Sequence, residues 1–119
     1  MKKILKVALI CIVSTVSAMA TSDCDCFVDR VWVNNGLGVF ISCPPSDVGK
    51  PSQYPYFGLP MDSPLADTFA TMAQAVKMQN LRNNSLPVSL YIWYDETDTS
   101  GTAWGCGESD CRTPQGFIS

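Results

Sequence analysis

Five cysteines behind a cleavable leader constrain the fold of this chain more than any other feature of its sequence. The chain opens with two lysines, continues in an apolar run over residues 7–16 and reaches the small-x-small triplet Ala18-Met19-Ala20. This pattern predicts a bacterial secretory signal peptide over residues 1–20, cut after Ala20. Export would place residues 21–119 in an oxidising compartment, where cysteines pair into disulfides.

The same leader predicts where the protein resides. Its apolar run is about ten residues long, roughly half of what a bilayer-spanning helix needs. We therefore expect a secreted or periplasmic protein with no membrane insertion after signal cleavage. Residues 21–119 are long enough for a single secreted domain with one modest core.

Charge and the lack of histidine exclude several function classes. Residues 21–119 carry five basic side chains against eleven acidic ones, a net charge of −6. Such a surface repels phosphate backbones and anionic lipids, so we expect no nucleic-acid partner. The chain contains no histidine, which removes Ser-His and Cys-His catalysis and the common zinc sites. We therefore expect no metal and no cofactor.

The cysteine spacing predicts two disulfides and one remaining thiol. Cys106 and Cys111 can close a small loop between themselves. Cys24 and Cys26 are too close to pair with each other, because a ring closed across one residue is strained. Spacing alone does not choose among the fifteen ways to form two bridges from five cysteines; we expect the second bridge from Cys43 to either Cys24 or Cys26, with the residue left over free or intermolecular.

Hydrophobic alternation and turn residues outline the elements. Strands are predicted over residues 27–33, 39–43 and 87–94, with a short closing strand over 113–119. The segment Asn34-Asn35-Gly36 predicts a hairpin between the first two strands. Residues 44–60 are rich in Pro, Gly and Ser, and they predict a long irregular surface loop.

One helix is predicted over residues 64–82. Ser63 is the expected N-cap and Pro64 the first helical residue, and Asn83-Asn84 is expected to end the helix. Four residues at helical spacing form the expected buried stripe, with Ala73 on its flank: Leu65, Phe69, Met72 and Val76. A second apolar patch is expected to pack under the long loop or to contact another subunit: Ala70, Met78 and Leu81.

Aromatic residues are the candidate ligand-binding groups. If the first hairpin pairs with strand 87–94, one sheet face carries Trp32, Tyr91 and Trp93. Those rings either fill the core or offer a flat surface with polar tips, which suits sugar rings or protein partners. Loops add further aromatic rings. The expected ligand-binding residues are Tyr54, Tyr56, Trp93 and Trp104.

The acidic segment 95–101 supports two weaker hypotheses. Oxygens at Glu96, Asp98 and Ser100 mimic the start of a calcium loop, but Gly107 stands where the bidentate Glu should be. The carboxyls of Asp95, Glu96 and Asp98 could instead serve a small hydrolase, which needs two acids across a cleft. The pattern favours a solvated turn.

Three segments in the second half of the chain resemble a known family. They are the predicted helix over 64–82, the strand Leu86-Pro87-Val88-Ser89-Leu90-Tyr91-Ile92 after it, and the late loop Cys106-Gly107-Glu108-Ser109-Asp110-Cys111. This order resembles the B subunits of subtilase-cytotoxin-like and typhoid-toxin-like A–B toxins. The resemblance implies an OB-like barrel, glycan or receptor binding, and no catalysis.

Together these observations predict an α+β fold, a small, OB-like, partly open antiparallel barrel with one helix, stapled by disulfides. We expect a non-enzymatic binding module for a glycan or a cell-surface receptor, able to form a homo-oligomer. The first alternative is a structural protein that assembles through its odd cysteine and the second helix patch. The second is the small hydrolase that uses acidic loop 95–98.

Overall fold

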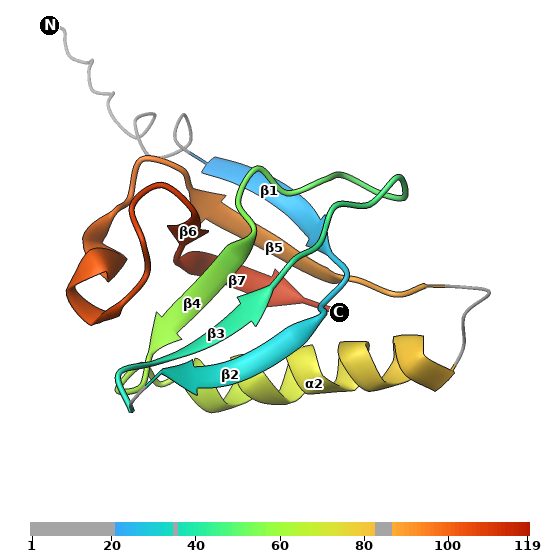
Figure 1. Cartoon of the computed structure of the whole chain (residues 1–119), viewed down its shortest axis with the longest axis horizontal. Helices are drawn as coiled ribbons and strands as arrows, with labels where there is room; N and C mark the ends of the chain where they lie inside the picture. The colour runs from blue at the N-terminus through green and yellow to red at the C-terminus, as the bar shows by residue number, and fades with distance from the viewer. Residues whose placement is uncertain (1–20, 35, 83–86) are drawn as a thin grey trace, which may run out of the picture.

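Two small β-sheets, one long α-helix and a short 3₁₀ helix make up the described part of this chain (Figure 1). The structure is a computed structural model that describes residues 21–34, 36–82 and 87–119. The predicted signal peptide and the predicted helix end at Asn83-Asn84 lie outside the described residues.

The first sheet has three antiparallel strands in the order β1-β5-β7. They are β1 (Thr21–Cys26), β5 (Leu90–Asp95) and β7 (Pro114–Ile118). In β5 the side chains of Leu90, Ile92 and Tyr94 are buried, and those between them are half-buried. This is the alternation that the sequence predicted for strand 87–94, and the predicted closing strand is β7.

The second sheet has four strands in the order β2-β3-β4-β6. They are β2 (Arg30–Asn34), β3 (Gly38–Ser42), β4 (Tyr56–Pro60) and β6 (Cys111–Arg112). The pairs β2–β3 and β3–β4 are antiparallel, whereas β4 and β6 run parallel. The predicted hairpin is the β2–β3 pair, with Gly36 at φ 72°. Its first strand begins at Arg30, three residues later than predicted.

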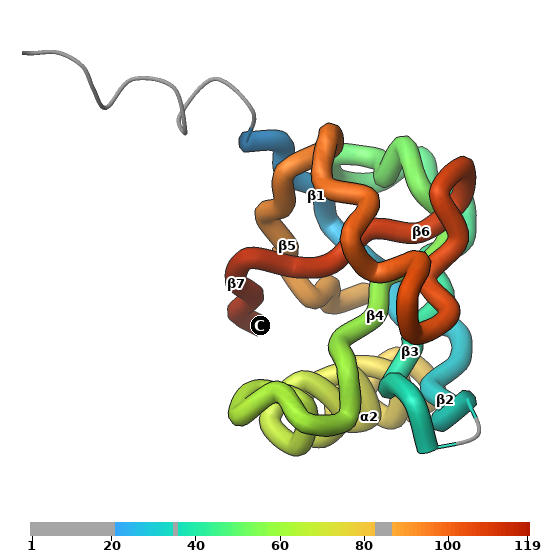
Figure 2. Tube along the Cα trace, turned by 90° about the vertical axis from the view of Figure 1, so that its left-hand side faces the viewer, coloured from blue at the N-terminus to red at the C-terminus, as the bar shows by residue number. Residues whose placement is uncertain are grey.

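Helix α2 (Ala66–Arg82) packs against strands of both sheets, and Figure 2 shows it closing one end of the molecule. The helix begins two residues later than predicted, so Ser63 is not its N-cap and Pro64 is not its first residue. The Ser63 Oγ instead accepts a hydrogen bond from the Leu65 backbone N–H at 3.1 Å, in the turn that leads into the helix. The buried residues are Ala66, Phe69, Ala73 and Val76. The prediction for Leu65 was wrong, because that side chain lies before the first turn and is 44 % exposed.

The core lies between the inner faces of the two sheets and the buried face of α2. Its largest fully buried side chains include Tyr94, Phe57 and Phe69. The two sheets are not closed into a barrel, since no strand of one pairs with a strand of the other among the described residues. Consequently the first hairpin does not pair with β5, so the condition for a shared aromatic face is not met and Trp32 lies in a different sheet from Tyr91 and Trp93.

Three strands were missed by the sequence analysis, the two-residue β6 and the longer β1 and β4. The segment β1 alternates Asp23 and Asp25 with two cysteines, which is a poor intrinsic strand pattern. The low intrinsic strand propensity of β1 is offset by its pairing with β5, in which Cys24 lies opposite Ile92. Strand β4 ends the segment that was predicted to be an irregular loop, and its Phe57 is fully buried. Contacts with distant parts of the chain, and not local propensity, therefore explain why the segments β1 and β4 form strands.

Both predicted disulfides are present. Cys106 bonds to Cys111, and Cys26 bonds to Cys43, which settles the choice that the spacing left open. Cys26 ends β1 and Cys43 directly follows β3, so this bridge links the two sheets. Cys24 is left as a free thiol with 0 % exposure in the core.

Cys24 yields a direct test of the core. Burial raises the pKa of its thiol to about 11, so roughly one thiol in a thousand is ionised at pH 8. We expect residues 21–119, folded and oxidised, to react with iodoacetamide at least about 100-fold more slowly than the same protein in urea. Mass spectrometry of the labelled protein measures both rates. Rapid labelling of the folded protein would contradict a sealed core around Cys24.

Candidate functional site

Aromatic side chains cover the face of the four-stranded sheet that points away from the core. Strand alternation puts Trp32 of β2, Phe40 of β3 and Tyr56 of β4 on this face, while their neighbours such as Ile41 enter the core. The ring centroids of Trp32 and Phe40 lie 5.8 Å apart at an interplanar angle of 22°. Tyr56 meets Trp32 edge-on, also at 5.8 Å.

A glycine in β4 makes room for this cluster. Gly58 faces Phe40 across the β3–β4 ladder. A Cβ at Gly58 would lie 2.6 Å from the Phe40 ring and 3.1 Å from the Trp104 ring. The two rings pack 5.7 Å apart, with Trp104 coming from the short helix η2 (Ser100–Trp104). Only a residue without a side chain allows both rings to lie this close to the sheet.

A cavity of about 260 Å³ opens between this aromatic face and the loop that carries the second disulfide. Trp32, Phe40 and Tyr56 line one side of it. Asn34 and Asp110 are its polar side chains, and both are half-buried. Within the described ranges, no hydrogen bond or ion pair engages the Asn34 amide or the Asp110 carboxylate. These two groups are therefore available to a bound molecule.

The far wall of the cavity is held rigidly. The Cys106–Cys111 disulfide closes the loop, and the Tyr56 backbone N–H donates to the carbonyl oxygen of Asp110 at 3.2 Å. Arg112 follows directly and is only 7 % exposed. Rigid support of this kind preorganises a ligand site and lowers the entropy cost of binding.

The buried guanidinium of Arg112 joins the acidic loop to the disulfide loop. Its Nε donates to the carbonyl oxygen of Glu96 at 2.8 Å, and its Nη1 donates to those of Glu108 and Cys111 at 2.6 and 2.7 Å. The guanidinium also lies 4.2 Å from the ring centroid of Tyr54. Several hydrogen bonds and one cation–π contact thus compensate the burial of this charge.

The four aromatics expected to bind ligand do not form one site. Tyr56 lines the cavity, and Trp104 packs behind it against Phe40. Tyr54 contacts Tyr94 at 5.8 Å and the guanidinium of Arg112. Trp93 lies on the other sheet, beside Tyr91 and over Gly116 of β7.

The sequence analysis did not single out Asn34, Phe40 and Asp110 as site residues. One signal could have found Phe40, because the predicted hairpin places it directly opposite Trp32. No comparable signal existed for Asp110, whose position depends on the parallel pairing of β4 with β6.

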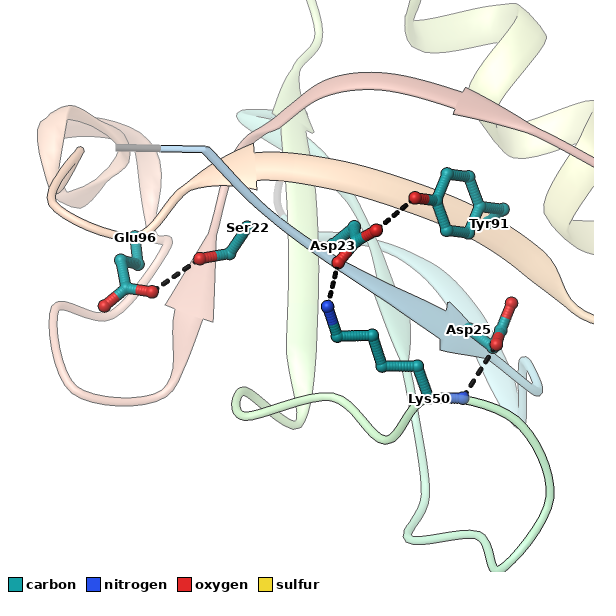
Figure 3. A network of polar contacts seen from close by, with 6 residues as sticks. All are labelled: Ser22, Asp23, Asp25, Lys50, Tyr91 and Glu96. Carbon is teal, nitrogen blue, oxygen red and sulfur yellow. Dashed lines mark hydrogen bonds and ion pairs between the residues drawn. The ribbon is translucent and has the colours of Figure 1, made fainter. Parts of the chain in front are cut away.

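A polar network covers the outer face of the three-stranded sheet (Figure 3). Asp23 of β1 forms an ion pair with Lys50 and accepts a hydrogen bond from the Tyr91 hydroxyl. Asp25 accepts a hydrogen bond from the Lys50 backbone N–H at 2.8 Å, and its own backbone N–H donates to the carbonyl oxygen of Lys50. These contacts pin residues 44–55, which we call the strap, along the edge of β1.

The contacts of this network shift the pKa values of Asp23, Lys50 and Tyr91. The hydrogen bond from Lys50, helped by the one from Tyr91, lowers the pKa of Asp23. The same contacts raise the pKa of Lys50 and of Tyr91, because Asp23 favours their protonated forms. Since all of these groups bond to one another, the network stabilises the strap and offers no group poised for chemistry.

The acidic side chains of residues 95–98 accept hydrogen bonds from nearby groups of the chain. Asp95 accepts hydrogen bonds from the Thr97 backbone N–H at 2.9 Å and from its hydroxyl at 2.6 Å, and these bonds lower the pKa of Asp95. A general acid needs the opposite shift. Glu96 accepts a hydrogen bond from Ser22, and Asp98 from the Ser100 backbone N–H. The described residues contain no group of three or more potential His, Cys, Asp or Glu metal ligands.

Comparisons with known protein families, with curated proteins and with solved structures find no match to this chain. None of the helices in the described ranges is both long and apolar enough to cross a bilayer.

The Asp23–Lys50 contact predicts how stability depends on pH. A carboxyl whose pKa is lowered in the folded state stabilises the fold above its unfolded pKa and loses that effect as pH falls through the folded value. We expect the free energy of unfolding to fall below about pH 4, and to fall less steeply in Asp23→Asn. Urea unfolding at pH 6 and pH 2.5 measures both slopes.

Asp29→Asn is the matched control, because it removes an equal charge at an exposed position. Equal acid sensitivity in the wild type and Asp23→Asn would show that the ion pair does not contribute to stability.

Proposed function

We propose that this protein is an exported, non-enzymatic binding module, and that the cavity between the aromatic face and the Cys106–Cys111 loop receives a sugar ring of a glycan. The observation that carries the proposal is the combination of aromatic surface and unpartnered polar groups in one place. Trp32 and Tyr56 are half-buried and supply flat apolar surface, while Asn34 and Asp110 supply hydrogen-bonding groups.

The size of the cavity supports a single small ring. Its volume of about 260 Å³ lies just below the roughly 300–1,000 Å³ that is typical of sites for drug-sized molecules. A sugar ring has an apolar face that stacks on an aromatic side chain and a rim of hydroxyls that needs donors and acceptors. The Asn34 amide provides both, and the Asp110 carboxylate is an acceptor.

The proposal extends to the type of fold and its setting. We propose an OB-like arrangement, supported by the two sheets that share a core without closing and by the helix inserted between β4 and β5. The two disulfides support an exported location, because disulfides persist in oxidising compartments. A glycan-binding B subunit of a toxin, the family that the second half of the chain resembles, would have these properties.

The test compares two tryptophans. Residues 21–119, fluorescently labelled, are applied to a glycan array as the wild type, Trp32→Ala and Trp93→Ala. We expect Trp32→Ala to weaken binding by about tenfold or more, because it removes a stacking surface, and Trp93→Ala to bind as the wild type does. Asn34→Ala serves as a second variant, because that side chain forms no hydrogen bond among the described residues.

Melting temperatures recorded for every variant separate a lost site from a lost fold. Wild-type protein that binds no glycan on the array would overturn the sugar proposal. Binding that depends on Trp93 and not on Trp32 or Asn34 would place the site on the other sheet.

Assembly through α2 is the second candidate function. Leu81 and Met78 are 68 % and 45 % exposed, and Leu81 borders a hollow of about 360 Å³ together with Phe27 and Pro45. The burial of Cys24 leaves this apolar patch, and not the odd cysteine, as the accessible element of that alternative.

Light scattering tests this alternative. If the patch joins subunits, the wild type has a mass several times that of one chain, and Leu81→Lys reduces it to a monomer because a buried charge is costly. Leu37→Lys is the control, since Leu37 is 51 % exposed at the far hairpin. A monomeric wild type would remove the assembly alternative.

A further inference from the structure

We infer that the aromatic cavity selects ligands that carry an organic ammonium group, so that the sugar it favours is an amino sugar with a free amine. This inference rests on the proposed binding function and specifies the chemistry of the ligand. It follows from the charge, the ring surfaces and the shape of the cavity.

The charge inside the cavity is negative. Among the residues that line it, Asp110 is the one with a formal charge, and no cation within the described ranges pairs with its carboxylate. A half-buried carboxylate next to aromatic rings is more weakly solvated than one in bulk water, so a positive ligand gains more by approaching it. The same carboxylate repels a ligand that carries a carboxylate or a phosphate.

The aromatic rings of the cavity also attract a positively charged ligand. Trp32, Phe40 and Tyr56 line the cavity, the face of an aromatic ring carries negative potential, and aromatic walls beside a carboxylate suit ammonium ions. The structure contains an internal example, because the guanidinium of Arg30 lies 4.8 Å from the ring centroid of Trp32. Arg30 does not line this cavity and belongs to a neighbouring hollow.

The backbone of the far wall preserves the position of both polar groups. Gly105 has φ 105°, a conformation that residues with side chains rarely adopt, and a Cβ there would lie 2.9 Å from Nδ2 of Asn34. A Cβ at Gly107 would collide with Oδ1 of Asp110. Two glycines thus leave room for the amide and the carboxylate at the cavity rim.

The experiment uses three probes on residues 21–119: a glucosamine trimer, the matching N-acetylglucosamine trimer, and tetramethylammonium. Titration calorimetry at pH 6, where the amines are protonated, measures their affinities. We expect the glucosamine trimer to bind at least about tenfold more tightly than its acetylated counterpart, because acetylation removes the charge. Tetramethylammonium should compete with it.

Asp110→Asn should abolish the preference for the amine and leave the melting temperature unchanged, since the backbone contact of Asp110 with Tyr56 remains. Glu108→Gln is the matched control, because Glu108 is an exposed acid of the same loop that does not line the cavity. It should keep the preference.

The possible outcomes distinguish the ammonium preference from the proposed binding of a sugar ring. Equal binding of the two trimers would overturn the ammonium preference and retain the sugar site. Binding of tetramethylammonium without either trimer would retain the cation site, assign it to a choline-like group and overturn the amino-sugar ligand. Failure of all three probes would overturn the ammonium site, and the glycan array would then decide whether another sugar binds.

Discussion

The Cys26–Cys43 disulfide is the constraint on which the arrangement of the two sheets depends. In the described part of the chain, no strand of one sheet pairs with a strand of the other, and a domain of this size buries a modest core. The covalent link between the end of β1 and the residue after β3 fixes one sheet against the other. It also limits the freedom of the unfolded chain across the intervening residues, which favours the folded state.

The alternation of side chains along the strands gives the molecule two outer faces with different chemistry. On the three-stranded sheet, carboxylates of β1 bind the strap through Lys50, and the polar groups satisfy one another. On the four-stranded sheet, aromatic rings line a cavity whose Asn34 amide and Asp110 carboxylate have no partner among the described residues. Groups left unsatisfied beside accessible apolar surface are what a binding site requires, and this contrast favours the second face.

Prediction from sequence succeeded where a pattern is local and failed where contacts are distant. The β2–β3 hairpin with Gly36 in its turn, the alternation in β5 and the close pair Cys106–Cys111 depend on neighbouring residues, and all are present. Strands β1 and β4 depend on partners far along the chain. The cavity does so as well, because Trp32 and Asp110 meet only after β4 has paired with both β3 and β6.

Arg112 has a consequence for how the molecule would respond to an acidic environment. Its guanidinium lies over the Tyr54 ring and donates to main-chain carbonyls, which do not take up protons as carboxylates do. The strap is held along β1 by the Asp23 carboxylate, which takes up a proton as the pH falls. Acid would therefore act on the strap along β1 and on the Asp95 turn, while the contacts of Arg112 with main-chain carbonyls beside the aromatic cavity persist, so that the two faces differ in durability as well as in chemistry.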